Sequence, residues 1–300
     1  MNCDPLDDGL ATVYGLIGIG LMGTALAERM LAAGMPVLGW DVSADRRAVL
    51  LQIGGRCATS IEQVFSRCDC VLLSLPSHET VSLVLENAAA SIRAGQIIVD
   101  TSTGDPAAAV SQAAKLAERD VEYLDATISG SSQQLREGTA VFLVGGNTTT
   151  YEQCRGILST LTSKSFHTGP AGSGARMKLV TNLVLGLNRA ALAEGISFAH
   201  QLGLDLNQAL FLLRESMAYS RIMDTKGEKM LSGDFSPQAR LSQHLKDVRL
   251  ILQSAHEANG NLPLTETHRV LLERAVEMGF GDLDNSAIIR AIAGSDFPAS

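Results

Sequence analysis

Short apolar runs alternate with amphipathic stretches between Val13 and His167, and this alternation limits the folds open to the chain more than any other feature. The apolar runs are VYGLIG, MPVLGW, VLLSLP, QIIVD, VEYLDA, AVFLVGG and SFH. Helices are expected between them, up to Gly34 and over residues 44–51, 78–92, 106–118 and 151–161. Strands that alternate with helices predict a parallel, doubly wound α/β sheet with ligands at the carboxyl ends of its strands.

The strand pattern stops after the segment HTGPAGSG at residues 167–174, and helical periodicity then continues along the chain. The first helix, from about Gly174 to Leu202, is long and apolar on most faces, so other elements must enclose it. We therefore expect an α/β domain over residues 1–170 and an all-helical domain over residues 171–300. Glycine and proline breaks within the helical part fall near Gly203 and at residues 233–237, 260–263 and 279–281.

The composition excludes several classes of protein. The net charge of the 300 residues is -8, which indicates no basic surface for nucleic acid. The apolar runs are too short or too interrupted to span a bilayer, and the first twelve residues do not resemble a signal peptide. The five cysteines and six histidines show no ligand spacing. We expect a cytoplasmic protein with free thiols and no metal, and neither nucleic acid nor membrane as a partner.

The first apolar run leads into a glycine-rich turn, GLIGIGLMGTALAERML, with the spacing Gly-x-Gly-x-x-Gly. Between a strand and a helix, such glycines allow a tight turn and the close approach of a pyrophosphate to the helix N-terminus. A turn that is merely tight is the alternative interpretation. The predicted dinucleotide-binding residues are Gly18, Ile19, Gly20, Leu21, Met22 and Gly23.

Asp41 ends the second predicted strand, where a carboxylate can accept hydrogen bonds from the ribose hydroxyls of a dinucleotide. The same carboxylate would repel a 2′-phosphate, which favours NAD as the cofactor. Arg46 and Arg47 follow closely and could instead meet that phosphate, so NADP is the alternative. Both arginines are also expected as solvated charges on a helix.

Further segments follow in one order: DTSTGDP at 100–106, DATISGS at 125–131, GSGARMKLVTN at 172–182 and LKDVRLIL at 245–252. With the glycine turn, this series resembles the β-hydroxyacid dehydrogenase family, which includes 3-hydroxyisobutyrate dehydrogenase and tartronate semialdehyde reductase. The resemblance implies an N-terminal Rossmann domain, a long connecting helix and a helical domain for substrate binding and dimerisation. It also implies hydride transfer between a nicotinamide cofactor and a small 3-hydroxy acid or its semialdehyde.

The resemblance implies roles for individual residues as well. Lys178 matches the catalytic lysine of the family, and Asn182 matches its paired asparagine. The segment Ser129, Gly130 and Ser131 matches a signature that holds the substrate carboxylate. Further cofactor contacts are implied at Leu75, Pro76, Thr80, Thr103 and Lys246.

The chain departs from the family pattern in places. Ser131 stands where glycine is common and adds a hydroxyl that could donate to a substrate or narrow the pocket. Thr80 replaces a common asparagine and Ala239 a common aromatic residue, so the substrate stays open. The structural alternatives are a turn at 129–131, a helix cap at Thr103 and a surface ion pair of Lys246 with Asp247.

Lys178 and Asn182 lie four residues apart and therefore on one face of an otherwise apolar helix. Burial beside a positively charged nicotinamide favours a neutral amine, which a proton carrier needs. We expect Lys178 to move the hydroxyl proton and Asn182 to orient it. A lysine that only extends its amine to solvent is the alternative.

Two other functions stay open on the same fold. One is a non-catalytic NAD(P)-binding scaffold, as in a chromatin-associated relative, and the other is an imine reductase, a group that usually replaces the lysine. Retention of Lys178 and Asn182 favours the dehydrogenase. Because one small helical domain cannot cover so apolar a helix, we expect a homodimer or homotetramer.

Overall fold

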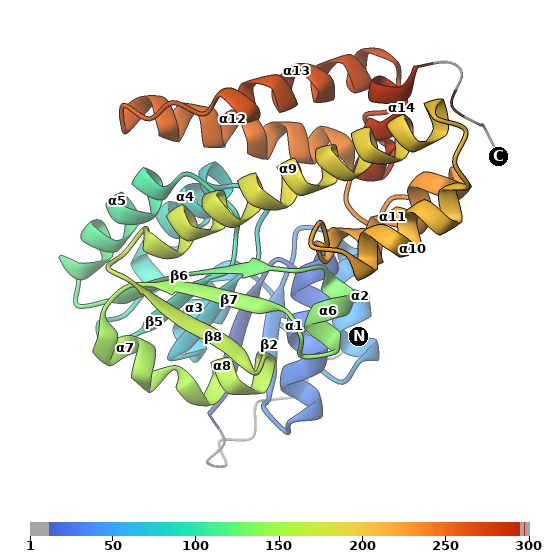
Figure 1. The fold of residues 1–300 in the computed structure, drawn as a ribbon. Coiled ribbons are helices and arrows are strands. Elements are labelled where there is room, and N and C mark those ends of the chain that lie inside the picture. The colour runs from blue at the N-terminus through green and yellow to red at the C-terminus, as the bar shows by residue number, and fades with distance from the viewer. Residues whose placement is uncertain (1–11, 295–296, 298–300) are drawn as a thin grey trace. The chain divides into compact units, whose positions relative to one another are not determined.

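The computed structural model describes residues 12–294 and residue 297, and the chain divides into two compact units (Figure 1). The first unit ends at Lys178 and the second begins at Leu179. The division therefore lies within helix α9 (Ser173–Gln201). This helix begins and ends within one residue of the predicted limits.

The first unit contains an eight-stranded sheet with the order β3-β2-β1-β4-β5-β6-β7-β8. Strand β1 pairs with both β2 and β4, so the direction of chain progress reverses there. This reversal confirms the doubly wound prediction, and sheets of this kind bind ligands beside the reversal, at the carboxyl ends of the strands. The strands are β1 (Tyr14–Ile17), β2 (Val37–Trp40), β3 (Arg56–Cys57), β4 (Cys70–Leu73), β5 (Ile97–Asp100), β6 (Glu122–Ser129), β7 (Val141–Gly145) and β8 (Lys164–Gly169).

One strand pair departs from the predicted parallel sheet. Strands β6 and β7 run antiparallel, with Ser129 opposite Val141, whereas the other pairs are parallel. The connection between them holds only the five-residue helix α6 (Ser132–Arg136). A parallel crossover needs about a dozen residues and usually a longer helix. The prediction of an entirely parallel sheet was wrong here because apolar periodicity does not report strand direction.

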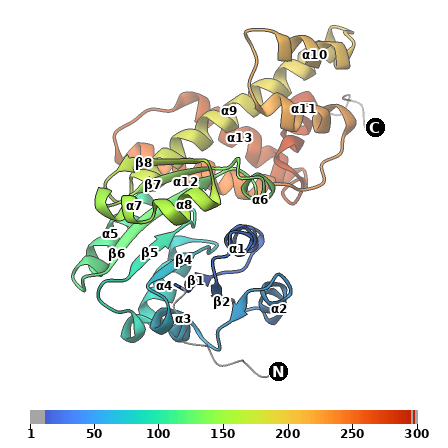
Figure 2. The ribbon, with the colours of Figure 1, turned by 90° about the horizontal axis from the view of Figure 1, so that it is seen from below.

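Helices cover both faces of the sheet and form two cores with it (Figure 2). Leu26 of α1 (Leu21–Ala32) and Leu50 of α2 (Ala44–Gln52) belong to one core, together with residues of α6 and α8 (Arg155–Leu161). Phe65 of α3 (Ile61–Arg67) belongs to the other, with residues of α4 (His78–Asn87) and α5 (Pro106–Ala117). The remaining segments of this unit are η1 (Ala89–Ser91) and α7 (Thr148–Gln153).

Three short elements, β3, α3 and α6, were not expected from the sequence. Each is shorter than the stretch over which apolar periodicity predicts a helix or a strand. Local capping explains α3, because the Ser60 hydroxyl accepts a hydrogen bond from the Gln63 N–H. The helix expected over 151–161 is divided at Cys154, and the helix expected over 78–92 ends before η1.

The second unit is helical, as predicted, and continues from α9. Leu192 and Ile196 of α9 pack into its core with Met230 and Leu272. Gly233 ends α11 with a φ of +70°, a left-handed conformation that favours glycine. The break between α10 and α11 was not expected. The elements are α10 (Leu206–Glu215), α11 (Ile222–Ser232), α12 (Leu241–Glu257), α13 (Pro263–Glu277), η2 (Asn285–Ala287) and α14 (Ile288–Ala293).

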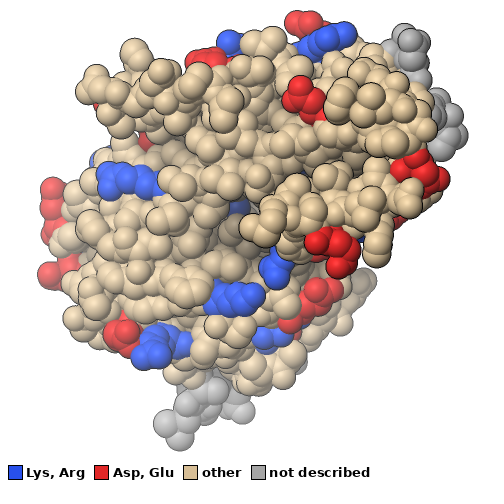
Figure 3. Space-filling view, viewed as in Figure 1, with Lys and Arg blue, Asp and Glu red and all other residues tan. Residues whose placement is uncertain are grey.

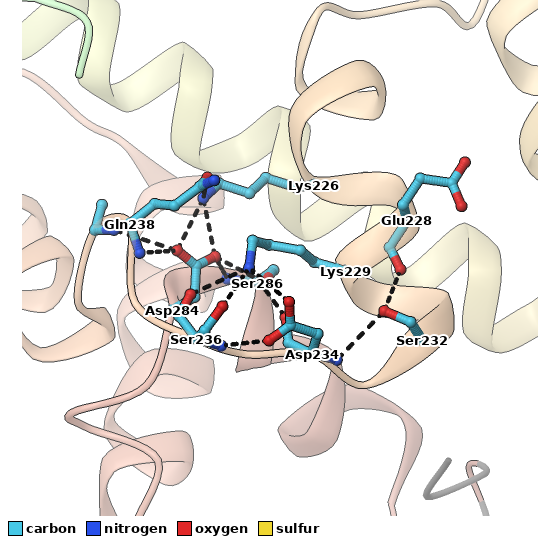
Figure 4. Close-up of polar contacts among 10 residues, drawn as sticks. Lys226, Glu228, Lys229, Ser232, Asp234, Ser236, Gln238, Asp284 and Ser286 are labelled. Atoms are coloured by element: carbon cyan, nitrogen blue, oxygen red, sulfur yellow. Dashed lines mark hydrogen bonds and ion pairs between the residues drawn. The ribbon is translucent and has the colours of Figure 1, made fainter. Parts of the chain in front are cut away.

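A buried aspartate organises the turn between α11 and α12 (Figure 4). Asp284 is fully buried, and Lys226 Nζ donates to both of its carboxylate oxygens at 2.9 Å. The N–H groups of Gln238 and Ala239 donate to the same carboxylate, and so does the Ser286 hydroxyl. Burial raises the pKa of Asp284, but the hydrogen bonds from Lys226 and Ser286 outweigh it and lower this pKa to about 2. The carboxylate therefore stays ionised.

Besides Lys226, the described residues of this unit include three further buried basic side chains, Arg189, His244 and His268. The rings of His244 on α12 and His268 on α13 have centroids 5.2 Å apart. Burial lowers the pKa of His244 well below its usual value and that of His268 to about 4, and the charge of Arg189 lowers both further. Gly186 permits this packing, because a Cβ there would lie 2.7 Å from His244 Nε2. This part of the core is therefore built around neutral imidazoles.

Surface charges of both signs are interspersed on the face drawn in Figure 3, where lysines and arginines lie in separate small groups. Within residues 12–294 and 297, no helix is long and apolar enough to cross a membrane. In the same part of the chain, no group of three or more His, Cys, Asp or Glu side chains could hold a metal ion. The cysteines described by the structure, Cys57, Cys68, Cys70 and Cys154, form no disulfide, and Cys3 lies outside the described residues.

Candidate active site

The glycine turn after β1 is tightly packed on one side and open on the other. Gly18 has a φ of +91°, and a Cβ on it would overlap the carbonyl oxygen of Ser74. A Cβ on Gly23 would overlap the carbonyl oxygen of Gly18. Glycine is therefore required at both positions. No atom lies within 4 Å of the place where Gly20 would carry a Cβ, so a ligand can approach the backbone there.

Helix α1 begins directly after this turn, and its N-cap Gly20 provides no side-chain hydrogen bond. The first N–H groups of a helix lack partners within the helix and carry a partial positive charge. The N–H groups of Leu21, Met22 and Gly23 are therefore donors suited to a pyrophosphate. Together with the open space at Gly20, they fit the dinucleotide that the sequence predicts.

Asp41 follows β2 and is hydrogen-bonded to the glycine turn. Its Oδ2 accepts from the Ile19 N–H at 2.6 Å, and its Oδ1 accepts from the Ser43 N–H at 2.8 Å. The guanidinium of Arg47 donates to the Asp41 carbonyl oxygen at 2.6 Å. The structure thus brings the predicted ribose-binding carboxylate and the predicted phosphate-binding turn together, with Arg47 beside them.

Leu75 and Pro76 lie on the connection from β4 to α4, and Thr80 follows within α4. A Cβ on Gly18 would stand 3.1 Å from Leu75 Cδ2, so Leu75 flanks the glycine turn. Thr80 lies in the first turn of α4, where its N–H donates to the hydroxyl of the N-cap Ser77 at 3.4 Å. Leu75 is therefore next to the predicted dinucleotide site, whereas Thr80 takes part in capping α4.

Thr103 lies on the connection from β5 to α5. The N-cap of α5 is Asp105, whose Oδ1 accepts from the Ala107 N–H at 2.9 Å, and Pro106 follows it. The capping role considered for Thr103 thus belongs to Asp105. This connection lies beside the start of α4, because a Cβ on Gly104 would stand 2.8 Å from His78 Cβ.

The segment from Ser129 to Ser131 joins the end of β6 to α6. Gly130 has a φ of +146° and separates the strand from the helix. Ser131 forms a capping box with Gln134: its hydroxyl accepts from the Gln134 N–H, and its own N–H donates to Gln134 Oε1 at 2.9 Å. The serine that replaces the common glycine therefore has a structural role that the sequence analysis missed.

Lys178 reaches this strand end from the second turn of α9. Its Nζ donates to the carbonyl oxygen of Ile128 at 2.7 Å. Ile128 directly precedes Ser129. The structure therefore brings the predicted catalytic amine to the strand that carries the predicted carboxylate-binding segment.

Asn182 and Lys246 belong to the helical unit. Asn182 is buried, and its Nδ2 donates to Asp247 Oδ2 on α12 at 3.3 Å. Lys246 is exposed on the same helix. Asp247, considered before only as an ion-pair partner of Lys246, thus contacts the predicted asparagine. The sequence places Asp247 beside Lys246 but gives no sign of its contact with Asn182, 65 residues away.

Two buried carboxylates that the sequence analysis did not single out lie on neighbouring strands. Asp100 of β5 is opposite Asp125 of β6, and burial raises the pKa of both. Tyr123 OH donates to Asp100 Oδ2 at 2.7 Å. These three side chains and Thr127 line a cavity of about 20 Å³, which has room for one water molecule. Asp100 and Asp125 begin the segments DTSTGDP and DATISGS, and their place directly after apolar runs was the signal available in the sequence.

Both parts of the chain match known protein families. Residues 13–169 match the NAD binding domain of 6-phosphogluconate dehydrogenase. Residues 172–292 match a family described as NAD-binding of NADP-dependent 3-hydroxyisobutyrate dehydrogenase. The matched residues include the glycine turn, the segment at 129–131 and Lys178.

Several proteins resemble the chain over most of its length. The 2-(hydroxymethyl)glutarate dehydrogenase of Eubacterium barkeri is 31% identical over 280 residues, 92% of this chain and 93% of that protein. The 2-hydroxy-3-oxopropionate reductase of Escherichia coli strain K12 is 32% identical over 284 residues, 93% of this chain and 96% of that protein. Cytokine-like nuclear factor N-PAC of Homo sapiens is 30% identical over 280 residues, but this is 51% of its length. A crystal structure of 3-hydroxyisobutyrate dehydrogenase from Salmonella typhimurium is 25% identical, with a TM-score of 0.84 over 93% of this chain and 99% of that one.

Proposed function

The chain belongs to the β-hydroxyacid dehydrogenase family of NAD(P)-dependent oxidoreductases, and we propose that Lys178 is its general acid/base. The proposed substrate is a small 3-hydroxy acid or the corresponding semialdehyde. The observation that carries this proposal is the 2.7 Å hydrogen bond from Lys178 Nζ to the Ile128 carbonyl. It holds the amine next to Ser129, where the carboxylate of such a substrate is expected.

In the proposed reaction a bound nicotinamide supplies the hydride acceptor for oxidation and the hydride donor for reduction. A neutral Lys178 amine donates one N–H to Ile128 and still has a lone pair for the substrate hydroxyl proton. In the reverse direction the protonated amine returns that proton to the carbonyl oxygen. Ser129 and Gly130 hold the substrate carboxylate, so the proton and the hydride leave neighbouring atoms of a fixed substrate. Asn182 orients the amine, and Lys246 is proposed as a further cofactor contact.

We propose NAD as the preferred cofactor. Support comes from the position of the Asp41 carboxylate, which contacts the glycine turn through Ile19 and would repel a 2′-phosphate. Arg47 is hydrogen-bonded to the backbone of Asp41 and Val42, so its charge is partly engaged there. Comparison of kcat/KM with NAD and NADP tests the preference, and a higher value with NADP contradicts it.

We propose that the protein forms a homodimer or homotetramer through its helical unit. Support comes from the large apolar side chains that this unit exposes on and beside α9 and α10, because a contact between subunits would remove them from water. Light scattering that gives a monomer at micromolar concentration would contradict the proposal. The exposed side chains include Val184, Phe198, Leu202, Phe211, Leu212 and Met217.

We also propose a cytoplasmic location, in which the cysteines stay reduced.

The decisive experiment is Lys178→Ala, assayed with 3-hydroxy acids and semialdehydes and with both cofactors. We expect turnover to fall on the order of 10²- to 10⁴-fold, while NAD binding measured by fluorescence is retained. Lys178→Arg is the matched control, because a guanidinium keeps the positive charge but cannot act as a base near neutral pH. Turnover of Lys178→Ala within a few-fold of the parent protein would mean that the lysine is structural.

The same assays separate the two alternative functions. Cofactor binding without turnover on any substrate would favour a non-catalytic scaffold. Reduction of a cyclic imine, without oxidation of any 3-hydroxy acid, would favour an imine reductase.

A further inference from the structure

A buried carboxylate of β6 accepts hydrogen bonds from the backbone at the start of α9. Asp125 is 3% exposed and lies in the middle of the strand. Its Oδ1 accepts from the Gly172 N–H and its Oδ2 from the Ala175 N–H, both at 2.8 Å. Both oxygens of the side chain are therefore used to hold backbone at the start of the helix.

Close backbone packing accompanies these hydrogen bonds. A Cβ on Gly174 would overlap the carbonyl oxygens of Asp125 and Leu143, and a Cβ on Gly145 would overlap Asp125 Oδ1. The Thr127 hydroxyl donates to the Gly174 carbonyl at 3.1 Å. The backbone at the start of α9 thus lies directly against the backbone of β6 and β7 at Gly174.

Lys178 follows this contact by less than one helical turn. Its Nζ meets the carbonyl oxygen of Ile128, so residues 125, 127 and 128 of β6 contact α9 in succession. A displacement of the first turn would move the amine along the strand. Misplacement of a reacting group by about 1 Å can lower a rate by about 10²-fold.

We propose that Asp125 is the positioning residue of the active site, which holds α9 against β6 and thereby places the Lys178 amine. The proposal rests on the proposed function, because it assumes that Lys178 moves the substrate proton. Asp125 itself lies below the strand end and acts through the helix.

The surroundings of Asp125 explain how its carboxylate can hold the start of α9 against β6. The side-chain oxygens of Asp125 accept from backbone N–H groups at the start of a helix, and the partial positive charge there stabilises an anion. Asp100 of β5 and Tyr123 of β6 line the same small cavity as Asp125, and the other titratable groups on it are His78 of α4 and Asp105 before α5. An amide at position 125 keeps the shape, but its NH₂ group would point at an N–H donor.

The test compares Asp125→Asn with Tyr123→Phe in the full-length protein. Tyr123 lies on the same strand and the same cavity, but it bonds Asp100 and not α9, so Tyr123→Phe is the matched control. Three quantities are measured: hydrogen exchange of residues 172–178, kcat as a function of pH, and KM for NAD. Thr127→Val is a milder variant for use if Asp125→Asn does not fold.

We expect Asp125→Asn to increase hydrogen exchange at residues 172–178 and to lower kcat on the order of 10- to 10²-fold. The ionisation of Lys178 in the pH profile should shift, and KM for NAD should change by less than about threefold. Thr127→Val should change the same quantities in the same direction, but less. Tyr123→Phe should keep the exchange pattern and the pH profile of the parent protein.

The proposal is overturned if Asp125→Asn leaves exchange unchanged, or if exchange rises while kcat and its pH profile do not change. Equal losses in Asp125→Asn and Tyr123→Phe also overturn it, because they would reflect general destabilisation. Failure of the proposed function is distinct: it is seen when Lys178→Ala retains turnover, whatever the exchange of residues 172–178 shows.

Discussion

Asp125 in the sheet unit and Asp284 in the helical unit are both buried carboxylates that hold backbone in place, but their partners differ in charge. Asp284 accepts from an ammonium, a hydroxyl and backbone N–H groups, and its pKa falls to about 2. Asp125 accepts from backbone N–H groups, and burial raises its pKa despite them. A buried cation lowers the pKa of a carboxyl group by more than burial raises it, whereas a few peptide dipoles only reduce the rise.

The comparison also separates two kinds of structural role. Asp284 and Lys226 fix a turn with a charge pair that stays ionised over the working range of pH. Asp125 holds a helix start with neutral donors, which leaves its protonation open to change. The Asp284 pair therefore stays charged, whereas the charge of Asp125 depends on its electrostatic surroundings.

The largest expected effect comes from removing the cation of the Asp284 pair. Lys226→Met leaves a buried charge without its ammonium and should lower the free energy of unfolding of the helical unit by about 3–5 kcal/mol. Urea unfolding followed by far-ultraviolet circular dichroism measures this loss. Trp40, the single tryptophan, lies on β2, so its fluorescence reports the sheet unit separately.

Lys229→Met serves as the control, because Lys229 pairs at 3.5 Å with Asp234, which is largely exposed. Loss of this pair should lower the free energy of unfolding by about 1 kcal/mol or less. Equal stability of the two variants would contradict the importance assigned to the buried pair.

The second largest effect should be a loss of stability of the helical unit in acid. His268 has a pKa of about 4 in the folded chain, below its usual 6.5, so the unfolded chain binds more protons between these values. The contribution of neutral His268 to the free energy of unfolding is fully present above about pH 6.5. About 3 kcal/mol of it is lost as the pH falls toward 4. Asp125, with its raised pKa, acts in the opposite direction, because its contribution is lost as the pH rises.

Urea midpoints at pH 7, 5.5 and 4.5 measure this loss by circular dichroism. His268→Phe should reduce the dependence on pH, whereas His256→Gln, at an exposed position, should leave it unchanged. A dependence that is the same in both variants would assign the acid sensitivity to other groups, such as His244.

The smallest effects should come from single hydroxyls. Ser286→Ala removes a 2.7 Å hydrogen bond to the ionised Asp284 and should cost about 2 kcal/mol. Thr127→Val removes a 3.1 Å hydrogen bond to the Gly174 carbonyl, which is neutral, and should cost about 1 kcal/mol. Thermal unfolding of both variants measures the two losses, and a lower melting temperature for Thr127→Val than for Ser286→Ala would contradict this order.

The sequence predicted features that depend on local pattern. The glycine spacing predicted the turn, the end of the second apolar run predicted Asp41 as a ribose contact, and four-residue spacing placed Lys178 and Asn182 on one face of a helix. The antiparallel β7 was not predicted, because a strand has the same apolar pattern in either direction. The contact of Asp125 with Ala175 joins residues 50 positions apart, so no local pattern contains it.

The capping role of Ser131 shows a second limit. Its likeness to a family signature pointed to the substrate, but Gln134 three residues later completes a capping box. Ser131 and Gln134 have the sequence spacing of a capping box, so this role was predictable from local pattern.

The hydrogen bond from the Ile19 N–H to Asp41 has a consequence for anyone who wishes to redesign cofactor preference. Before any nucleotide arrives, this bond already restricts the glycine turn, so less conformational entropy remains to be lost on binding. Replacing Asp41 with a small neutral residue would remove the repulsion of a phosphate and loosen the turn at the same time. A redesign toward NADP must therefore keep a hydrogen-bond acceptor for Ile19, and asparagine is the replacement that retains one.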